Sequence, residues 1–240
     1  MKPESRVNPF DAGILHFFNQ FVHRSWAFDS FIVLISSNHL IKGGVLVALI
    51  WWVWFRDSNI ETRELIFAGV IASLIAIVLA RVLAHVLVFR ERPINNAGLH
   101  LKLPYTLDEA SLIHWSSFPS DHAVVFFALA TSIWFVSRGA GAFALCYTTV
   151  VVCLTRVYLG IHYPTDMLAG AILGIGIARL AKIPEIRIQL SRAAMEWLEK
   201  SPGLFYAFFF LLTFQLATIF DPARGIVTFF RKVLEGALAH

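Results

Sequence analysis

Charged residues are scarce in this sequence. Only 15% of its 240 positions are Asp, Glu, Lys or Arg, whereas soluble globular domains carry about 25%. Hydrophobic residues make up 58% of the chain, and the mean hydropathy is +0.68. This composition excludes an ordinary soluble domain and predicts an all-α, polytopic integral membrane protein. We expect residues 1–240 to form a single membrane-embedded domain.

Cysteine and targeting signals are also sparse. Cys146 and Cys153 share one apolar run, and neither has a second cysteine or histidine at metal-ligand spacing. We therefore expect no disulfide, no metal site and no cofactor. The segment from Met1 to Pro9 is polar and lacks the hydrophobic core and cleavage site of a signal peptide. The membrane spans themselves are expected to direct insertion.

The basic residues show no stripe or cluster. The net charge is +4, but the Lys and Arg residues are spread through short connections, so nucleic acid is not indicated as a partner. The lipid bilayer and a membrane lipid are the expected partners. With the site residues set aside, the basic residues divide eight and eight between the two sides of the predicted topology. Charge therefore gives no orientation, and the oligomeric state stays open.

Apolar runs recur along the chain. Crossing a hydrocarbon core of about 30 Å takes roughly 20 helical residues. The candidate spans are 28–55, 65–89, 119–136, 143–159, 164–181 and 204–220. We predict a bundle of six transmembrane helices with an N-terminal interfacial helix at 14–22. Polar residues from Ser36 to Lys42 must face protein or mark a break in the first span.

Several secondary expectations concern packing and connections. Gly170, Gly174 and Gly176 are expected to allow close helix packing. The tryptophans at 51, 52 and 54 are typical of an interfacial aromatic belt, and the phenylalanines of 205–220 are expected to contact lipid. The connection 90–118 is a possible lid, residues 182–201 an amphipathic connection, and 221–240 a tail with a surface helix.

The polar residues that remain fall at three places. They are Arg92 after the second span, the segment from Ser120 to His122 at the start of the third, and the segment from Arg156 to Asp166 between the fourth and fifth. In a six-helix topology these three places lie on one side of the membrane. A functional site on that side is therefore predicted. Placing an ionisable side chain in a membrane costs free energy, so such residues usually serve a function.

The residue types suit a phosphoryl group. Two guanidiniums bind phosphate oxygens with forked geometry, and helix starts at Pro119 and Pro164 present free N–H groups to an anion. Asp166 lies four residues after His162, so it can hold one imidazole nitrogen as N–H and leave the other as a nucleophile. His122 has no carboxylate at that spacing and is the expected general acid.

Three motifs carry a family resemblance. Arg-Pro at 92–93, Pro-Ser-x-His at 119–122 and Arg-x5-His-x3-Asp at 156–166 resemble the signature of the type 2 phosphatidic acid phosphatase family. The resemblance implies six membrane helices and metal-independent hydrolysis of lipid phosphates or pyrophosphates through a phosphohistidine. By position it implies that Arg92, Arg156 and Ser120 bind phosphate, that His122 is the acid, and that His162 with Asp166 is the nucleophilic pair.

Two positions depart from the family pattern. His85 stands where the family usually has lysine, and Arg81 or protonated His85 is a candidate for the missing charge, although His85 also fits a core histidine. Positions 81, 85, 88 and 92 are expected to share one helix face. Asp121 stands where many members have glycine, as in the branch with bacterial undecaprenyl pyrophosphate phosphatases. It is expected near the phosphate site, where it points away, pairs with an arginine, tunes His122 or serves as a helix N-terminal charge.

The leading expectation for function is therefore an enzyme that hydrolyses undecaprenyl pyrophosphate. The alternatives are a phosphatase for a phospholipid monoester, such as phosphatidic acid or phosphatidylglycerol phosphate, and a non-catalytic protein that binds or transports a lipid phosphate. Resemblance to the undecaprenyl branch implies a bacterial plasma membrane location with the site facing the periplasm or exterior.

Overall fold

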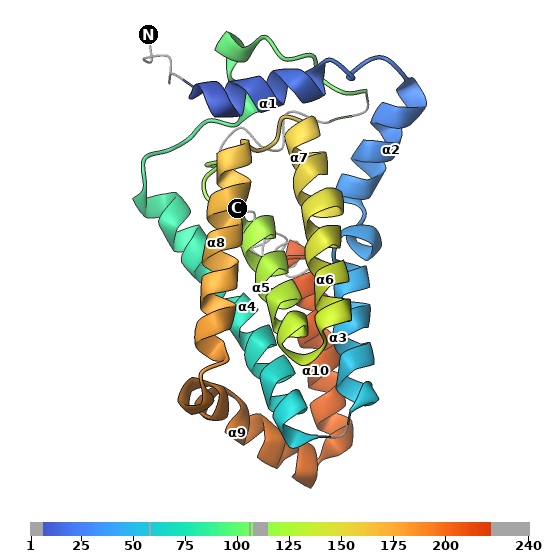
Figure 1. The fold of residues 1–240 in the computed structure, drawn as a ribbon, viewed down its shortest axis with the longest axis vertical. Coiled ribbons are helices and arrows are strands. Elements are labelled where there is room, and N and C mark those ends of the chain that lie inside the picture. Colours follow the sequence, from blue (N-terminus) through green and yellow to red (C-terminus); the bar gives the residue numbers. More distant parts are fainter. Residues whose placement is uncertain (1–6, 58, 106, 108–114, 222–240) are drawn as a thin grey trace, which may run out of the picture.

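A computed structural model describes residues 7–57, 59–105, 107 and 115–221 of the chain. These residues form helices and connecting segments, and no β-strand is found among them. In chain order the elements are α1 (Pro9–Asn19), α2 (Trp26–Ser37), the π-helical turn η1 (Leu40–Gly44), α3 (Val45–Arg56), α4 (Ile60–Val86), the 3₁₀ turns η2 (Pro93–Asn95) and η3 (Ala97–Leu99), α5 (Asp121–Val136), α6 (Arg138–Tyr147), the π-helical segment η5 (Thr148–Leu154), α7 (Thr155–Tyr158), α8 (Pro164–Ala181), α9 (Pro184–Lys200) and α10 (Pro202–Ala217) (Figure 1). The all-α prediction is confirmed for these residues.

Helix α5 occupies the centre of the bundle. It packs against α4, α6 and α8, and its residues from Ala123 to Phe126 are completely buried. A helix that is hydrophobic all round belongs inside a protein, and apart from its first turn α5 has few polar side chains. The residues at its N-terminus, Asp121 and His122, are therefore held by a rigid central element.

Helix α8 lies unusually close to α5. A Cβ atom at Gly174 would lie only 2.3 Å from the carbonyl oxygen of Val124, and one at Gly170 would lie 2.7 Å from the Cβ of Ala123. Glycine is required at such an approach because any side chain would overlap the neighbouring backbone. At Gly176 a Cβ would meet nothing within 4 Å, so the expected packing role of that glycine is wrong.

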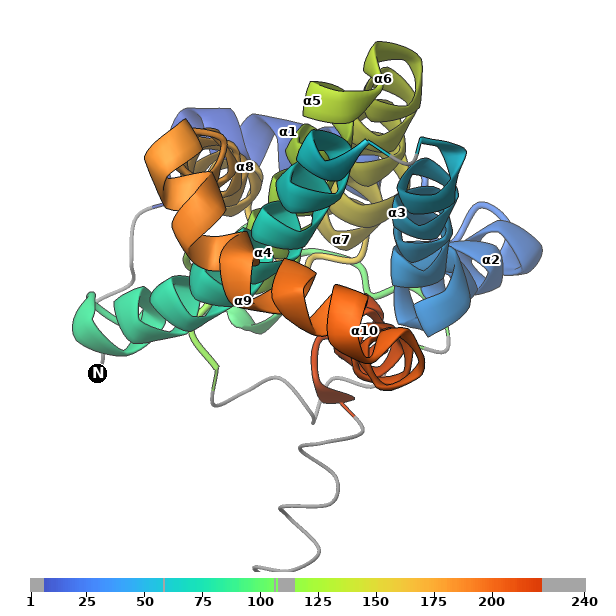
Figure 2. The same cartoon turned by 90° about the horizontal axis from the view of Figure 1, so that it is seen from below.

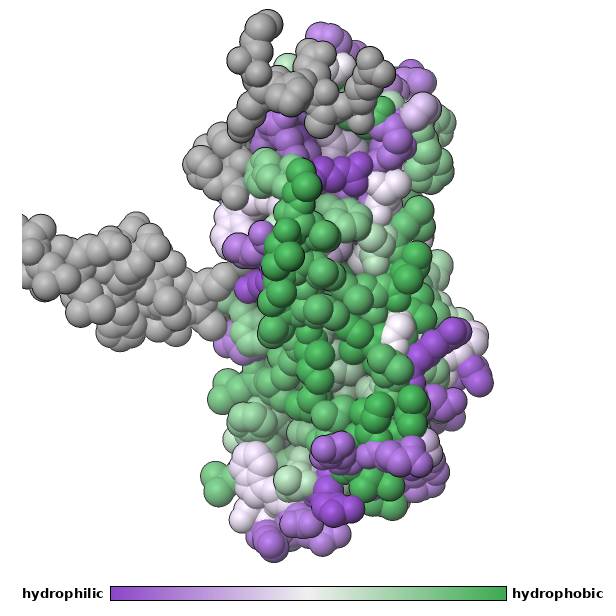
Figure 3. Space-filling model, turned by 90° about the vertical axis from the view of Figure 1, so that its left-hand side faces the viewer, coloured by the Kyte–Doolittle hydropathy of each residue, from purple (hydrophilic) through white to green (hydrophobic). Residues whose placement is uncertain are grey.

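Three helical segments of the described chain are long and apolar enough to cross a membrane: Ile60–Val86, Arg138–Tyr158 and Pro164–Ala181. Helices α2 and η1–α3 form a fourth candidate that is bent by 60°, and the bend falls within the polar stretch that the sequence marked as a possible break. Helices α5 and α10 are shorter apolar helices. All six predicted runs are helical, whereas six complete spans stay a prediction. One face of the molecule has a hydrophobic band between two hydrophilic ends (Figure 3).

Helix α1 crosses one end of the bundle, above α7 and α8 (Figure 1). The Asn8 side chain caps it by accepting from the backbone N–H of Asp11 at 2.8 Å, and Pro9 occupies its first turn. The predicted bounds of 14–22 are therefore wrong, because the capping residues, rather than the first apolar residues, set the start of this helix. An interfacial location for α1 stays a prediction.

The opposite end of the bundle holds α9 and the neighbouring ends of α3, α4 and α10 (Figure 2). Trp54, Phe205 and Phe209 are completely buried there, with the Trp54 ring centroid 4.8 Å from that of Phe209. The predicted belt position of Trp54 and the predicted lipid contact of these two phenylalanines are therefore wrong. Residues 106 and 108–114 of the expected lid, and residues 222–240 of the expected tail, lie outside the described residues.

Candidate active site

His162 lies in the short connection between α7 and α8. Gly160 starts this connection with a φ of +67°, which glycine adopts without strain. The imidazole Nδ1 lies 2.9 Å from the carbonyl oxygen of Ser117 and 3.5 Å from Oδ2 of Asp166. Because both groups only accept hydrogen bonds, Nδ1 carries the proton and Nε2 keeps its lone pair. Nε2 is therefore the nitrogen available as a nucleophile.

Arg92 faces that lone pair. One guanidinium nitrogen of Arg92 donates to the carbonyl oxygen of Ile161 at 2.9 Å and lies 3.1 Å from Nε2 of His162. The backbone N–H of Ile94 donates to the carbonyl oxygen of Gly160 at 2.8 Å, which joins the Arg-Pro segment to the histidine connection. The first and third motifs, about seventy residues apart in sequence, therefore meet at His162.

The environment keeps the imidazole of His162 neutral, with a proton on Nδ1 only. The side chain is 4% exposed, and burial lowers the pKa of His162 below its ordinary value because the charged imidazolium loses hydration. The positive charge of Arg92 lowers this pKa further, while the Asp166 carboxylate acts in the opposite direction. A neutral imidazole is the form that can attack phosphorus.

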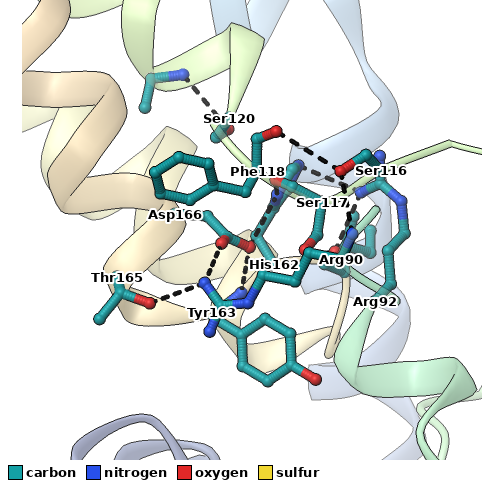
Figure 4. Close-up of polar contacts among 12 residues, drawn as sticks. Arg90, Arg92, Ser116, Ser117, Phe118, Ser120, His162, Tyr163, Thr165 and Asp166 are labelled. Carbon is teal, nitrogen blue, oxygen red and sulfur yellow. Dashed lines mark hydrogen bonds and ion pairs between the residues drawn. The ribbon is translucent and has the colours of Figure 1, made fainter. Parts of the chain in front are cut away.

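Asp166 is completely buried in the first turn of α8. Its Oδ2 accepts from the backbone N–H of Tyr163 at 2.8 Å, and its Oδ1 accepts from the Arg90 guanidinium at 2.5 Å (Figure 4). The structure brings Asp166 beside His162, as the spacing suggested. Ser117, however, supplies the shorter contact to Nδ1, and a backbone carbonyl leaves no signal in sequence.

His122 has a carboxylate partner of its own. Its Nδ1 lies 2.9 Å from Oδ1 of Asp121, and this oxygen also accepts the backbone N–H of His122 at 2.9 Å. No carboxylate stands four residues after His122, and its partner is instead the preceding residue. Neighbours in sequence do not face each other within a helix, but Asp121 is the first residue of α5. Its side chain folds back over the helix start, and the free N–H expected at His122 is occupied.

Asp121 also contacts an arginine. Its Oδ2 lies 3.8 Å from a guanidinium nitrogen of Arg81. Two of the alternatives open for Asp121, an arginine partner and contact with His122, therefore occur together.

Arg156 and Ser120 complete the set predicted from the motifs. Arg156 is 4% exposed and donates to the carbonyl oxygen of Val152 at 3.1 Å, and it interacts electrostatically with His122 and Arg92. Ser120 is the N-cap of α5, where its Oγ accepts from the backbone N–H of Ala123. The position of Ser120 explains the start of α5, and phosphate binding by its hydroxyl stays a prediction.

A cavity of about 260 Å³ opens beside His162. Its polar lining includes Arg81, Arg92, Asp121 and His162. Apolar side chains form a second part of the wall: Ala80, Ala84, Leu87, Phe89 and Trp115. His122 and Arg156, although described, are not among the lining residues. The cavity thus combines cationic groups with an apolar wall, as a lipid phosphate requires.

Four buried polar atoms of the site have no hydrogen-bond partner among the described residues. They are Nη2 of Arg81, Nε of Arg92, Oγ of Ser117 and Nε2 of His122. Buried polar groups are nearly always satisfied in folded proteins, so each of these four atoms can still hydrogen-bond to a ligand or to water. Within the same residues, no group of three His, Cys, Asp or Glu side chains is arranged to hold a metal ion.

His85 lines the cavity near Arg81. Its Nδ1 lies 2.7 Å from the carbonyl oxygen of Arg81, so this nitrogen donates within its own helix. Helix α4 ends at Val86, and Arg92 lies beyond it. The expectation that positions 81, 85, 88 and 92 share one helix face is therefore wrong, and the chain itself turns Arg92 back towards the site.

Two charged residues of the site were not expected. Arg90 binds Asp166, and its other terminal nitrogen donates to Oδ2 of Asp11 at 2.7 Å. Asp11 is completely buried, as is Asp166. The sequence contained a local signal for the start of α1 at Asn8 and Pro9, but no pattern linked Asp11 to a residue about eighty positions away.

Comparisons with known proteins agree with the geometry. A sequence profile described as the PAP2 superfamily matches residues 86–183. The Lipid A 1-diphosphate synthase of Escherichia coli (strain K12) is 30% identical over 174 residues, which cover 68% of this chain and 70% of that protein. The undecaprenyl-diphosphatase BcrC of Bacillus subtilis (strain 168) is 26% identical over 160 residues, 66% of this chain and 75% of that protein.

One solved structure shares the fold. The crystal structure of Aquifex aeolicus LpxE aligns with a TM-score of 0.51 and 22% identity, covering 75% of this chain and 98% of that one. At this identity the likeness concerns the fold alone.

Proposed function

Because this chain belongs to the PAP2 superfamily, and is thus an integral membrane lipid phosphate hydrolase, we propose that it hydrolyses a polyprenyl pyrophosphate. Undecaprenyl pyrophosphate is the first candidate, since the relative from Bacillus subtilis is named for that activity. The observation that carries the proposal is the cavity of about 260 Å³ beside His162. Arg81 and Arg92 line it, and each has a guanidinium nitrogen with no hydrogen-bond partner among the described residues.

The proposed mechanism uses the two histidines in sequence. Nε2 of His162 attacks the terminal phosphorus, and the P–O bond to the lipid monophosphate breaks. His122 protonates the departing oxygen and then accepts a proton from the water that hydrolyses the phosphohistidine. Arg92 and Arg156 stabilise the charge on the transferring phosphoryl group.

The second phosphate of a pyrophosphate is assigned to Arg81. A guanidinium remains charged when partly buried, and one terminal nitrogen of Arg81 lies in the site without a hydrogen-bond partner among the described residues. His85 has one nitrogen engaged within its helix, which makes Arg81 the better replacement for the family lysine. The apolar wall includes Leu87 and Phe89, which are 42% and 52% exposed, and offers a path for the lipid tail.

The test is release of inorganic phosphate from a panel of lipid phosphates in detergent with chelator present. The panel contains undecaprenyl pyrophosphate, phosphatidic acid and phosphatidylglycerol phosphate. We expect the pyrophosphate to be preferred, His162→Ala to be inactive, and His16→Ala, an exposed histidine of α1, to match the wild type. Undiminished phosphate release by His162→Ala would refute the mechanism. Preference for a monoester would make a phospholipid monoester, rather than undecaprenyl pyrophosphate, the proposed substrate.

A second candidate rests on the relative from Escherichia coli, whose name describes synthesis of a lipid diphosphate. A phosphohistidine passes its phosphoryl group to a lipid phosphate as readily as to water if the acceptor reaches the site. Adding a lipid monophosphate acceptor to the same assay separates the two outcomes. A new diphosphate product with less inorganic phosphate would indicate transfer.

The orientation is part of the proposal. We infer a bacterial plasma membrane location with the site facing the periplasm or exterior, supported by the relative named undecaprenyl-diphosphatase. Labelling of a single cysteine introduced at exposed Gly98 by a membrane-impermeant reagent tests it. If the cysteine is labelled only after the cells are broken, the site faces the cytoplasm and the inferred orientation is wrong.

A further inference from the structure

Arg90 joins three elements behind the catalytic histidine. One terminal nitrogen donates to Oδ1 of Asp166 at 2.5 Å and to Oγ1 of Thr165 at 2.9 Å, and the other donates to Oδ2 of Asp11 at 2.7 Å. The guanidinium carbon lies 4.0 Å from the centre of the Tyr163 ring. The forked shape of arginine allows it to hold two carboxylates at once, so Arg90 ties α1 to the first turn of α8.

Asp11 completes the connection by capping α8 from another helix. Its Oδ1 accepts the backbone N–H of Thr165 at 2.9 Å, and its Oδ2 accepts the Thr165 hydroxyl at 2.6 Å and the Asn8 side-chain amide at 2.8 Å. Free N–H groups in the first turn of a helix need such an acceptor. Asp11 is itself completely buried, so its negative charge has to be balanced by these contacts and by Arg90.

The two oxygens of Asp166 have separate tasks in this arrangement. Oδ1 is held by Arg90, while Oδ2 caps Tyr163 and approaches Nδ1 of His162 at 3.5 Å. Rotation of the carboxylate would break the Arg90 contact and move Oδ2 away from the imidazole. The orientation of Asp166 therefore depends on Arg90, and that of Arg90 depends on Asp11.

The Asp11, Arg90 and Asp166 side chains are separate from the substrate cavity. None of the three is among the residues lining the cavity, whereas His162 and Arg92 are. Arg90 approaches the carboxylate that neighbours Nδ1 of His162, and Arg92 approaches Nε2. Arg90 is therefore placed to act on the reaction through Asp166 and His162.

We propose that Arg90 and Asp11 are positioning residues for His162, and that α1 is thereby a working part of the catalytic site. The inference deepens the proposed function and rests on it. Arg90 fixes the Asp166 carboxylate and offsets its charge, and Asp11 fixes Arg90 and offsets the charge of its guanidinium. The two residues therefore act on the protonation of His162 in opposite directions.

The experiment compares Arg90→Gln with Asp11→Asn. Arg90→Gln removes a positive charge near the imidazole, while the Tyr163 N–H still holds Oδ2 of Asp166, so the uncompensated carboxylate raises the pKa of His162. Oδ1 of Asp166 loses its partner and the imidazole is held less firmly, so kcat falls about 10- to 100-fold with KM unchanged. Asp11→Asn removes a negative charge, so the pKa of His162 falls. The acid limb of the kcat profile moves with it, to higher pH in Arg90→Gln and to lower pH in Asp11→Asn.

Arg90→Lys separates charge from geometry. A lysine ammonium keeps the positive charge but cannot reproduce the fork, so the His162 pKa stays near the wild-type value while kcat still falls. Arg24→Gln and Glu91→Gln are matched controls, because both side chains are exposed on the same end of the molecule. We expect both to retain the wild-type kcat and pH profile.

The pKa of His162 is read directly by NMR of histidine labelled with ¹³C in detergent micelles, with His162→Asn used to assign the signal. This readout needs no substrate. If the wild type releases phosphate from no lipid, the proposed function fails while the His162 titration still tests the positioning. An unchanged His162 pKa in Arg90→Gln, equal shifts in both variants, or a raised KM with unchanged kcat would overturn the inference.

Discussion

Different interactions stabilise the two ends of the helical bundle. At the site end, formed by α1, η2, η3 and the connection before α8, charged side chains contact an opposite charge or a carbonyl group. Asp166 is completely buried there, and the side chain of its partner Arg90 is 28% exposed. At the aromatic end, formed by α9 and the neighbouring ends of α3, α4 and α10, rings pack on rings. Trp54 and Phe209 are completely buried there.

Because the two ends are stabilised differently, we expect substitutions at the aromatic end to change stability and substitutions at the site end to change activity. Ring packing is non-directional and its energy grows with the area buried, so a substitution there changes stability without changing the chemistry. A buried ion pair adds little net stability, because desolvation offsets much of the attraction. Its geometry is directional, however, and the Arg90–Asp166 pair fixes the carboxylate that lies beside His162.

Phe209→Ala, at the aromatic end, should have the largest effect on stability. The ring lies among Trp51, Trp54, Phe67 and Phe205, and its removal leaves a cavity that costs about 3–5 kcal/mol of unfolding free energy. Unfolding in mixed micelles titrated with SDS measures it. The folded fraction should keep its kcat, because the site end is untouched.

The neighbouring Phe208 is the matched control for that substitution. It lies one position along α10 and is 47% exposed, so Phe208→Ala should cost far less than Phe209→Ala. Equal losses in the two variants would show that ring size rather than burial determines stability at the aromatic end.

Arg92→Lys tests the opposite behaviour at the site end. A lysine cannot contact both the Ile161 carbonyl and the phosphate with a planar fork, so we expect kcat/KM to fall about 100-fold, or about 2.7 kcal/mol of transition-state stabilisation. Unfolding free energy should change little. Phosphate release and SDS titration on the same preparation provide both numbers.

The control for this variant is Arg138→Lys. Arg138 lies outside the site end, at the start of α6, and its guanidinium contacts the Trp134 ring. It should retain full activity. A stability loss in Arg92→Lys as large as that in Phe209→Ala would remove the distinction between the ends.

The sequence predicts those parts of the fold that depend on interactions between residues close together in the chain. Long apolar runs specify α4 and α8, and Pro164 marks the first residue of α8 correctly. The interior position of Phe205 and Phe209 was not predicted, because hydropathy does not distinguish burial against lipid from burial against protein. Only the neighbouring helices decide that question.

The site shows the same division. Motif spacing places Asp166 beside His162, and the structure puts them 3.5 Å apart. The partners supplied by distant segments, Asp11 and the carbonyl of Ser117, were missed because no periodicity links them to His162. Asp121 departs from the family pattern in sequence. Its contact with the His122 backbone N–H depends on the geometry of the first turn of α5, which the sequence pattern does not specify.

Arg187→Met should have the smallest effect, and it tests whether every ion pair in the molecule matters alike. Arg187 of α9 contacts Glu61 at 2.7 Å and Glu64 at 3.3 Å, and Glu61 is 59% exposed. The contact with exposed Glu61 contributes about 0–1 kcal/mol and is screened by salt. The more buried contact with Glu64 is offset by desolvation, and methionine keeps the apolar contacts of the arginine stem. We therefore expect a small loss of unfolding free energy that disappears in high salt, and unchanged kcat. Arg192→Met, an exposed arginine on the same helix, should show no salt-dependent loss. A loss above about 2 kcal/mol, well beyond the range for exposed pairs, would mean that α9 is docked by charge and that directional contacts hold both ends.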